Sequence, residues 1–176
     1  MQRVSGMDAA FLNLETPTAH MHVIGDVILD PSTAPASDGG FGFSEIEAAL
    51  RDRFHLIPPF RRRAVPPPGK IDHPVWMKDP EFDLAKHVTR AQLPAPMSWK
   101  DLERSTCEFA GIELQRDRPL WAISIVQVLE DGQVAMVPKL HHAIMDSAAG
   151  GELMASLFDL TSDVGSTAPA ADPWAP

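Results

Sequence analysis

Apolar residues run almost without interruption from Trp121 to Leu129. A segment that is apolar on both faces is typical of a central strand that is covered on both sides of its sheet. Residues 130–132 (EDG) then predict a turn, and residues 133–140 predict a second strand that returns antiparallel to the first. This hairpin is the predicted centre of the fold, because it leads directly into the stretch that is richest in reactive side chains.

Four other segments show the helical spacing of apolar residues that is typical of amphipathic helices. They are residues 5–14, 44–54, 98–111 and 147–160. Ser44 and Ser98 each precede an acidic residue by three positions, which is the spacing of a capping box at the start of a helix. Helices that alternate with strands, one antiparallel hairpin among them, predict an α/β fold in which helices pack on a mixed sheet.

Three shorter segments have the composition of strands, namely residues 20–29, 74–78 and 87–93. His20 and His22 fall on one face of the first, with no cysteine or paired carboxylate nearby in the sequence. We interpret them as polar residues near a strand end rather than as metal ligands. His87 begins the third segment, has no recognisable partner and is expected to be exposed to solvent.

The net charge of the chain excludes one class of function. Among 176 residues, 15 are basic and 24 are acidic, which gives a net charge of −9. Nucleic-acid binding is not expected, because phosphate neutralisation needs clustered Lys and Arg.

Cys107 is the only cysteine, so no internal disulfide can form. Residues 1–14 lack a secretory signal and no apolar run reaches the roughly 18–20 residues of a spanning helix, which predicts a cytoplasmic protein.

The candidate reactive stretch follows the hairpin and contains His141, His142 and, four positions after the second histidine, Asp146. An imidazole titrates near neutral pH and can act as a general base. If the strand stays extended, successive side chains alternate between faces, so the two rings cannot face one substrate. One ring is then available for chemistry while the other packs or holds the turn. Asp146 is expected at the start of the next helix, where its carboxylate accepts backbone N–H bonds.

Pro138 lies three positions before His141 and has no backbone N–H. Since proline cannot donate to a strand ladder, regular pairing of the second strand is predicted to end just before His141.

The sequence changes character at Thr161. Residues 1–160 carry the periodic apolar pattern, whereas Ser, Asp, Gly, Ala and Pro dominate residues 161–176. Such a composition is typical of a linker between domains. We therefore expect residues 1–160 to form an N-terminal half-domain, and the linker to lead to a C-terminal half-domain that this chain lacks.

The stretch from His141 to Ser147 (HHAIMDS) resembles the HHxxxDG motif of the coenzyme A-dependent acyltransferase superfamily, which includes chloramphenicol acetyltransferases and condensation domains of peptide synthetases. Further features resemble the bacterial wax ester synthase/diacylglycerol acyltransferase family, particularly its actinobacterial triacylglycerol synthases. They are the opening MDAAFLNLE followed by HMHVIG, the run PPFRR at residues 58–62, and PLW at residues 119–121. The resemblance covers residues 1–160 and implies a chloramphenicol-acetyltransferase-like half-domain.

The resemblance implies a transferase that moves a long-chain acyl group from acyl-CoA to diacylglycerol or to a fatty alcohol. Acyl-CoA would be a co-substrate, with no permanently bound cofactor and no metal. Matched to the family motif, His142 would be the general base, His141 a supporting residue and Asp146 the residue that orients the motif loop. Peripheral contact with a membrane or lipid droplet is compatible with such substrates.

Pro119, Leu120 and Trp121 match a family motif near the substrate channel, which implies a role in substrate binding. A buried tryptophan at the start of a strand is an equal alternative for this segment.

Ser147 replaces the final glycine of the motif and adds a side chain where the family leaves room for the backbone to approach the substrate. Two alternatives to the acyltransferase therefore stand. One is a non-catalytic or impaired relative that binds acyl-CoA or lipid. The other is a hydrolytic metal site of His141, His142 and Asp146, which is disfavoured because neighbouring strand residues diverge. Because the family builds its active site between two halves, the half-domain alone is expected to be inactive.

Overall fold

The computed structural model describes residues 2–34, 41–54, 57–91, 97–126, 129 and 132–145. Within them the helices are α1 (Gly6–Leu14), α2 (Phe43–Arg53) and α3 (Trp99–Ala110). The strands are β1 (Gln2–Arg3), β2 (His22–Ile24), β3 (Val27–Leu29), β4 (Arg62–Val65), β5 (Val75–Lys78), β6 (Val88–Arg90), β7 (Trp121–Val126) and β8 (Val134–His141). Short 3-10 helices are η1 (Pro31–Thr33), η3 (Pro58–Arg61), η4 (Pro68–Lys70), η5 (Leu84–Lys86) and η6 (His142–Ile144).

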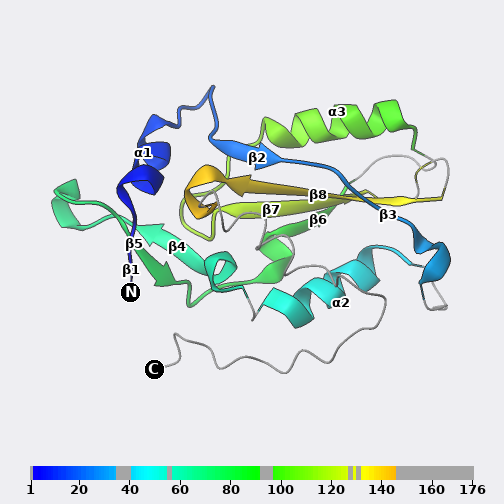
Figure 1. The fold of residues 1–176 in the computed structure, drawn as a ribbon, viewed down its shortest axis with the longest axis horizontal. Coiled ribbons are helices and arrows are strands. Elements are labelled where there is room, and N and C mark those ends of the chain that lie inside the picture. Colours follow the sequence, from blue (N-terminus) through cyan, green and yellow to red (C-terminus); the bar gives the residue numbers. More distant parts are fainter. Residues whose placement is uncertain are drawn as a thin grey trace.

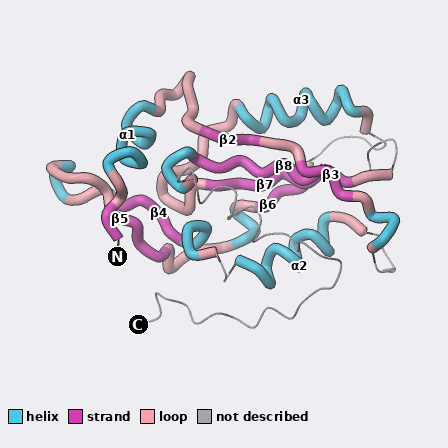
Figure 2. The backbone as a smooth tube through the Cα atoms, viewed as in Figure 1, coloured by secondary structure: helices cyan, strands magenta, loops and turns pink. Residues whose placement is uncertain are grey.

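The larger sheet has the strand order β2-β8-β7-β6, and β3 also pairs with β8 (Figure 1). β6 and β7 are parallel, whereas all other pairs in this sheet are antiparallel, so the predicted mixed sheet is confirmed. A smaller antiparallel sheet, β1-β5-β4, lies at one end of the larger one, beside α1 (Figure 2).

Helices pack on both faces of the larger sheet, because its central strands are apolar on both faces. Ile46 and Leu50 of α2 share one buried cluster with Ile123, Ile125 and Met136. Leu102 of α3 belongs to a second cluster with Val126, Ala135 and Val137. The alternation of side chains along β7 and β8 thus supplies a core to each face, as the continuous apolar pattern predicts.

The predicted central hairpin is confirmed, with β7 and β8 paired antiparallel from Trp121 opposite Leu140 to Val126 opposite Ala135. Gly132 lies in the connection with a φ of 83°, a left-handed conformation that favours glycine.

The prediction that Pro138 ends regular pairing is wrong, because β8 continues to His141. The Pro138 carbonyl accepts the Gly25 N–H at 3.3 Å, so the backbone polar groups of Pro138 face the gap between β2 and β3. In an antiparallel strand the nitrogen of a residue lies on the same side as its carbonyl, so the absent N–H of Pro138 falls where β8 already has no regular partner. Pairing of β8 with β7 is therefore unaffected. The predicted single strand over residues 20–29 is accordingly two short strands.

The two capping predictions have different outcomes. Ser98 caps α3 as expected, accepting the Asp101 N–H at 3.2 Å while Asp101 reaches back to it. Helix α2 begins at Phe43, one residue before the predicted start, and its cap is Gly42 instead of Ser44. The Gly42 N–H donates to the Glu45 side chain at 3.0 Å.

His87 is buried, with 2% of its surface exposed, and the prediction that it faces solvent is wrong. Its Nδ1 lies 2.8 Å from the Trp121 carbonyl, and its ring stacks on the indole with centroids 4.4 Å apart. A partner 34 positions away in the sequence satisfies the polar atom, which allows the imidazole to pack in the core.

Candidate functional site

The chain turns sharply where β8 ends at His141. The backbone N–H of His141 donates to the Leu120 carbonyl at 3.0 Å, which is the last bond between β8 and the segment entering β7. The imidazole Nδ1 of His141 then accepts the Ala143 N–H at 3.0 Å, so this side chain caps η6. His141 is completely buried and holds the turn that carries His142.

His142 is half-buried and is the first residue of η6. Its backbone N–H donates to the Met21 carbonyl at 2.8 Å, and its own carbonyl accepts the Met145 N–H at 3.0 Å. The imidazole stacks on the Phe11 ring of α1, with centroids 4.8 Å apart and planes 19° from parallel. Backbone bonds on both sides and one stacked face fix the position of this ring, while it keeps partial access to solvent.

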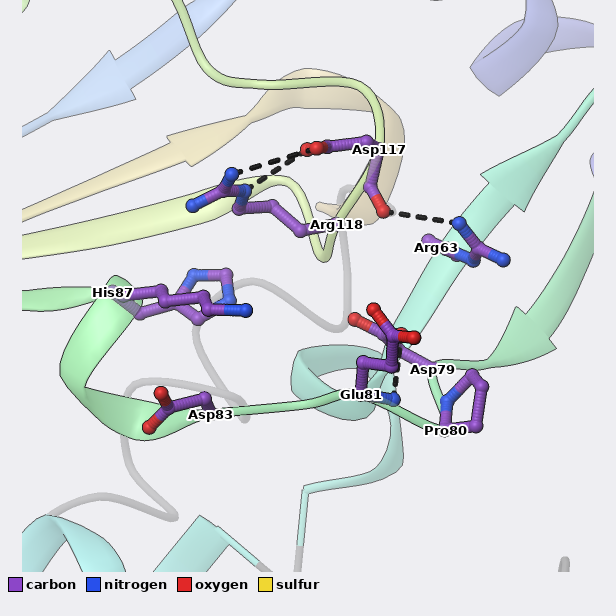
Figure 3. A pocket seen from close by; sticks show the side chains of 9 residues that line it. Arg63, Asp79, Pro80, Glu81, Asp83, His87, Asp117 and Arg118 are labelled. Carbon is purple, nitrogen blue, oxygen red and sulfur yellow. Dashed lines mark hydrogen bonds and ion pairs between the residues drawn. The ribbon is translucent and has the colours of Figure 1, made fainter.

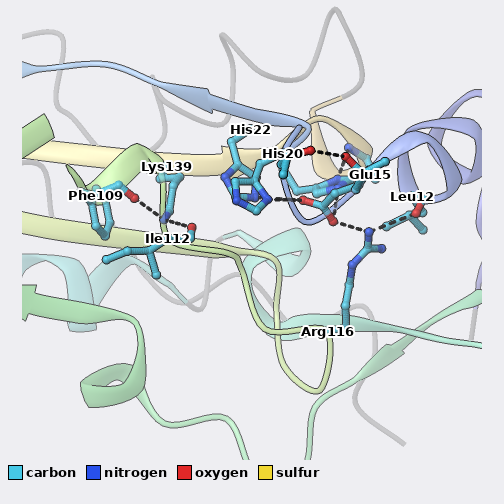
Figure 4. A network of polar contacts seen from close by, with 12 residues as sticks. Leu12, Glu15, His20, His22, Phe109, Ile112, Arg116 and Lys139 are labelled. Carbon is cyan, nitrogen blue, oxygen red and sulfur yellow. Dashed lines mark hydrogen bonds and ion pairs between the residues drawn. The ribbon is translucent and has the colours of Figure 1, made fainter. Parts of the chain in front are cut away.

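Glu15, directly after α1, is the centre of a polar cluster that is buried except at Arg116 and that sequence reasoning missed (Figure 4). Its Oε1 lies 3.2 Å from His22 Nε2 and 3.7 Å from His20 Nδ1. Its Oε2 forms an ion pair with Arg116 and lies 3.5 Å from His141 Nε2. The carboxylate therefore connects α1, β2, β8 and the segment before β7. We name these five residues the Glu15 cluster.

Within the Glu15 cluster, the pKa shifts favour an ionised Glu15 carboxylate and neutral imidazoles at His22 and His141. Burial is the largest single effect and would raise the pKa of Glu15, but the positive charge of Arg116, the hydrogen bond from Arg116 and smaller charge effects of neighbouring side chains together outweigh it, and the pKa is lowered. Burial lowers the pKa of His22 to about 4, reinforced by the positive charge of Lys139. Burial likewise lowers the pKa of His141 to about 4, against the opposing attraction of Glu15. At neutral pH the rings of His22 and His141 are uncharged.

We expect acid to destabilise the fold between about pH 6.5 and 4. The folded-state pKa values of His22 and His141 lie below the ordinary value of 6.5, so the stability they contribute is present above pH 6.5 and is lost as pH falls toward 4. Each group adds a slope of about 1.4 kcal/mol per pH unit to the free energy of unfolding. Urea unfolding of the full-length protein at a series of pH values measures this slope.

The matched variants for this measurement are His22→Gln and His141→Gln, which remove one titrating ring each and should flatten the slope. His73→Gln, at an exposed position, is the control and should leave it unchanged. Equal slopes in all four proteins would contradict the assignment.

Glu15, His20 and His22 also place one potential metal-ligating atom each within 4.8 Å of the others. The two rings, however, are stacked with centroids 5.0 Å apart and planes 10° from parallel. Metals bind imidazole in the plane of the ring, so parallel rings do not direct their lone pairs at one ion. Arg116 also neutralises the carboxylate already. The arrangement favours a polar packing cluster, and the absence of a metal stays a prediction.

Lys139, two residues before His141 on β8, fixes α3 to the sheet (Figure 4). Its ammonium donates to the carbonyls of Phe109 at 2.7 Å and Ile112 at 2.6 Å, and it lies 4.2 Å from the centroid of the Phe109 ring. Burial lowers the pKa of Lys139 to about 8. A cation at the end of a helix satisfies terminal carbonyls and complements the helix dipole.

The segment Pro119–Trp121 enters the core. Leu120 is completely buried, and Trp121 is 2% exposed with its indole N–H donating to the Phe60 carbonyl at 2.8 Å. The indole lies 4.7 Å from the Phe54 ring and 5.0 Å from the Phe60 ring, measured between centroids. The structure thus shows the core packing that was the alternative for this segment, and the substrate-binding role stays a prediction.

Two clefts in the described part of the chain differ in chemistry. One, of about 240 Å³, lies beside His87 and is lined mainly by charged side chains of both signs, such as Arg63, Asp79 and Arg118 (Figure 3). The other, of about 420 Å³, lies between α1 and the β4–β5 hairpin and combines proline, alanine and leucine side chains with Arg116. His142 lines neither cleft.

The structure brings His141 and His142 to one turn, and strand β7 places Trp121 in the core behind it. Asp146 and Ser147 lie outside the described residues, as do the predicted helix over residues 147–160 and the linker over residues 161–176. Arg116 carries no local motif. Glu15 is the last residue of the MDAAFLNLE stretch, from which no role for it followed. Its spacing of four positions from Phe11 was a second signal, because Glu15 directly follows α1 on the side that carries Phe11.

Comparison with known proteins decides the family. Residues 4–176 match the model for the wax ester synthase/diacylglycerol acyltransferase catalytic domain. The chain belongs to this family. The resemblance of the HHAIMDS, PLW and PPFRR stretches is thereby confirmed as a family relationship.

Relatives in the wax ester synthase/diacylglycerol acyltransferase family include a Mycobacterium tuberculosis protein (strain H37Rv) named as a diacylglycerol O-acyltransferase. It is 37% identical over 176 residues, which is 100% of this chain and 36% of the relative. A second protein of that strain with the same type of name is 37% identical over 174 residues, covering 98% of this chain and 33% of the relative. The chain thus spans about a third of the length of these relatives.

Solved structures confirm the chloramphenicol-acetyltransferase-like fold. The wax ester synthase/diacylglycerol acyltransferase from Marinobacter aquaeolei VT8 superposes with a TM-score of 0.66 at 27% identity, covering 86% of this chain and 36% of that one. The starter condensation domain of rhizomide synthetase superposes with a TM-score of 0.63 at 12% identity, covering 89% and 36%, which shows the shared fold alone. Among the described residues, no helix is both long and apolar enough to cross a membrane.

Proposed function

We propose that the complete protein transfers a long-chain acyl group from acyl-CoA to the hydroxyl of diacylglycerol or of a fatty alcohol, with His142 as general base. The observation that carries this proposal is the position of His142, which sits directly after the central hairpin at the second histidine of the family motif. Backbone bonds to Met21 and Met145 and the stack on Phe11 hold the ring in place while it stays partly accessible.

The proposed reaction uses one imidazole for both proton transfers. The His142 ring removes the proton of the acceptor hydroxyl as the oxygen attacks the carbonyl carbon of the thioester. The new C–O bond forms, the C–S bond breaks, and the departing thiolate of coenzyme A takes the proton from the imidazolium. The products are an ester and free coenzyme A, and no acyl-enzyme or bound cofactor is required.

The rest of the site is proposed to come from a C-terminal half-domain of the same protein, reached through residues 161–176. Two observations support this: the chain spans 36% of its relative's length, and neither described cleft is lined by His142. Contact with a lipid surface is part of the proposal; Met7, Leu14 and Ile71 are among the exposed large apolar side chains.

The full-length protein should be assayed across acyl-CoA chain lengths, with diacylglycerol and a fatty alcohol in competition. We expect ester to form in equal amounts with free thiol, and thiol release to stop when both acceptors are omitted. Thiol release without ester would point to a hydrolase and overturn the proposal. If the protein bound acyl-CoA without turnover, and Ser147→Gly restored turnover, the non-catalytic relative would be favoured instead.

A further inference from the structure

We propose that Glu15 is a positioning residue, which sets the tautomer of His141 and through it the turn that carries His142. This inference rests on the proposed function for its catalytic consequence. The tautomer itself can be measured without any assay of activity.

The hydrogen bonds of His141 determine where its proton lies. The Ala143 N–H donates to Nδ1 at 3.0 Å, so Nδ1 must carry a lone pair. A neutral imidazole has one N–H, which must then be on Nε2. His141 is completely buried, and burial lowers its pKa, so the neutral form is the relevant one.

Glu15 is the group that faces the protonated nitrogen. Its Oε2 lies 3.5 Å from His141 Nε2 without a hydrogen bond between them, and its side chain is 5% exposed, so the carboxylate acts on the ring through its charge. An Nε2–H near the carboxylate is attracted to it, whereas a bare lone pair there would be repelled, and both effects are strong in a buried setting. The carboxylate thus favours the tautomer that leaves Nδ1 free to accept from Ala143.

The carboxylate is itself held in place from two sides. Arg116 forms an ion pair with Glu15 and also donates to the Leu12 carbonyl at 3.0 Å, which ties it to the last turn of α1. On the other side, His22 Nε2 lies 3.2 Å from the second carboxylate oxygen without a hydrogen bond, so His22 restricts Glu15 by packing. The two Arg116 bonds and this packing limit the freedom of Glu15 to turn away from His141.

Loss of the carboxylate would remove the preference between the two tautomers. With the proton on Nδ1, the ring would oppose the Ala143 N–H, and the cap of η6 would be lost. The next residue is His142, so a change at this turn shifts the proposed base directly. α1 also supplies Phe11, the stacking partner of His142, so one helix supports both histidines.

The test combines nitrogen NMR with kinetics on the full-length protein. With isotope-labelled histidine, and with His141→Gln to assign the signal, wild-type His141 should be the Nε2–H tautomer at pH 7. Finding the Nδ1–H tautomer or a charged ring would overturn the inference. This measurement needs no substrate, so it separates failure of the inference from failure of the proposed function.

In Glu15→Gln the signal of His141 should shift toward a tautomer mixture, and kcat should fall about 10- to 100-fold. KM for acyl-CoA should stay within about twofold, because the Glu15 side chain is 5% exposed and is not proposed to contact acyl-CoA. Glu15→Asp, which keeps the charge, should restore part of kcat. Glu103→Gln, at an exposed position on α3, is the matched control and should match wild type. An unchanged His141 signal in Glu15→Gln would overturn the assigned role.

Discussion

The His142→Ala protein is expected to lose about 100- to 10,000-fold in kcat, the range typical of a positioned general base. Alanine cannot take the proton of the attacking hydroxyl, so the alcohol would have to react without assistance. The measurement is release of free thiol and formation of ester by the full-length protein under saturating acyl-CoA.

The stack of His142 on Phe11 makes a second variant necessary, because alanine removes packing as well as the base. His142→Gln keeps a planar polar group at this position but cannot act as a base, and it should lose activity to a similar degree. His73→Ala removes an exposed imidazole and should leave kcat unchanged. If His142→Gln kept a tenth or more of the wild-type kcat, the ring would be a packing group and the mechanism would fail.

Replacing Trp121 by alanine should lower the free energy of unfolding by about 3–5 kcal/mol, as expected for a large side chain removed from a core. The indole is 2% exposed, packs between Phe54, Phe60 and His87, and donates one hydrogen bond to a buried carbonyl. Its loss would leave a cavity and an unsatisfied acceptor together. Chemical denaturation of the full-length protein measures the change.

Trp99→Ala is the control for Trp121→Ala, because Trp99 is 42% exposed at the start of α3. Its effect should be about 0.5 kcal/mol or less. The pair also separates the two roles considered for Trp121. If Trp121 only contacted substrate, Trp121→Ala would raise KM and leave the free energy of unfolding unchanged. That outcome would contradict the placement of Trp121 in the core.

Local patterns in the sequence predicted the elements that local physics decides. The apolar run at residues 121–129 predicted a strand covered on both faces, and packing by α2 and α3 confirms it. Ser98 and Asp101 predicted the start of α3 through their reciprocal hydrogen bonds. The motif stretch at residues 141–147 identified the family, although two of its members lie outside the described residues.

Contacts between residues far apart in the sequence could not be predicted from local patterns. Glu15 and Arg116 meet across 101 positions, and no local pattern in the sequence pairs them. His87 finds its partner only when β6 lies parallel to β7. The effect of Pro138 was predicted wrongly, because β8 accommodates a proline only where its partner strands are interrupted at Gly25. That interruption cannot be read from the sequence of β8 itself.

The parallel pairing of β6 with β7 has a consequence for the order of assembly. α3 lies between these strands in sequence, so their pairing must close a long loop, whereas β7 and β8 pair across a short turn. Because the entropy lost on loop closure grows with loop length, the hairpin is the portion of the sheet with the least conformational freedom to give up. The strand that leads to the two histidines is thus the one whose alignment depends least on distant parts of the polypeptide.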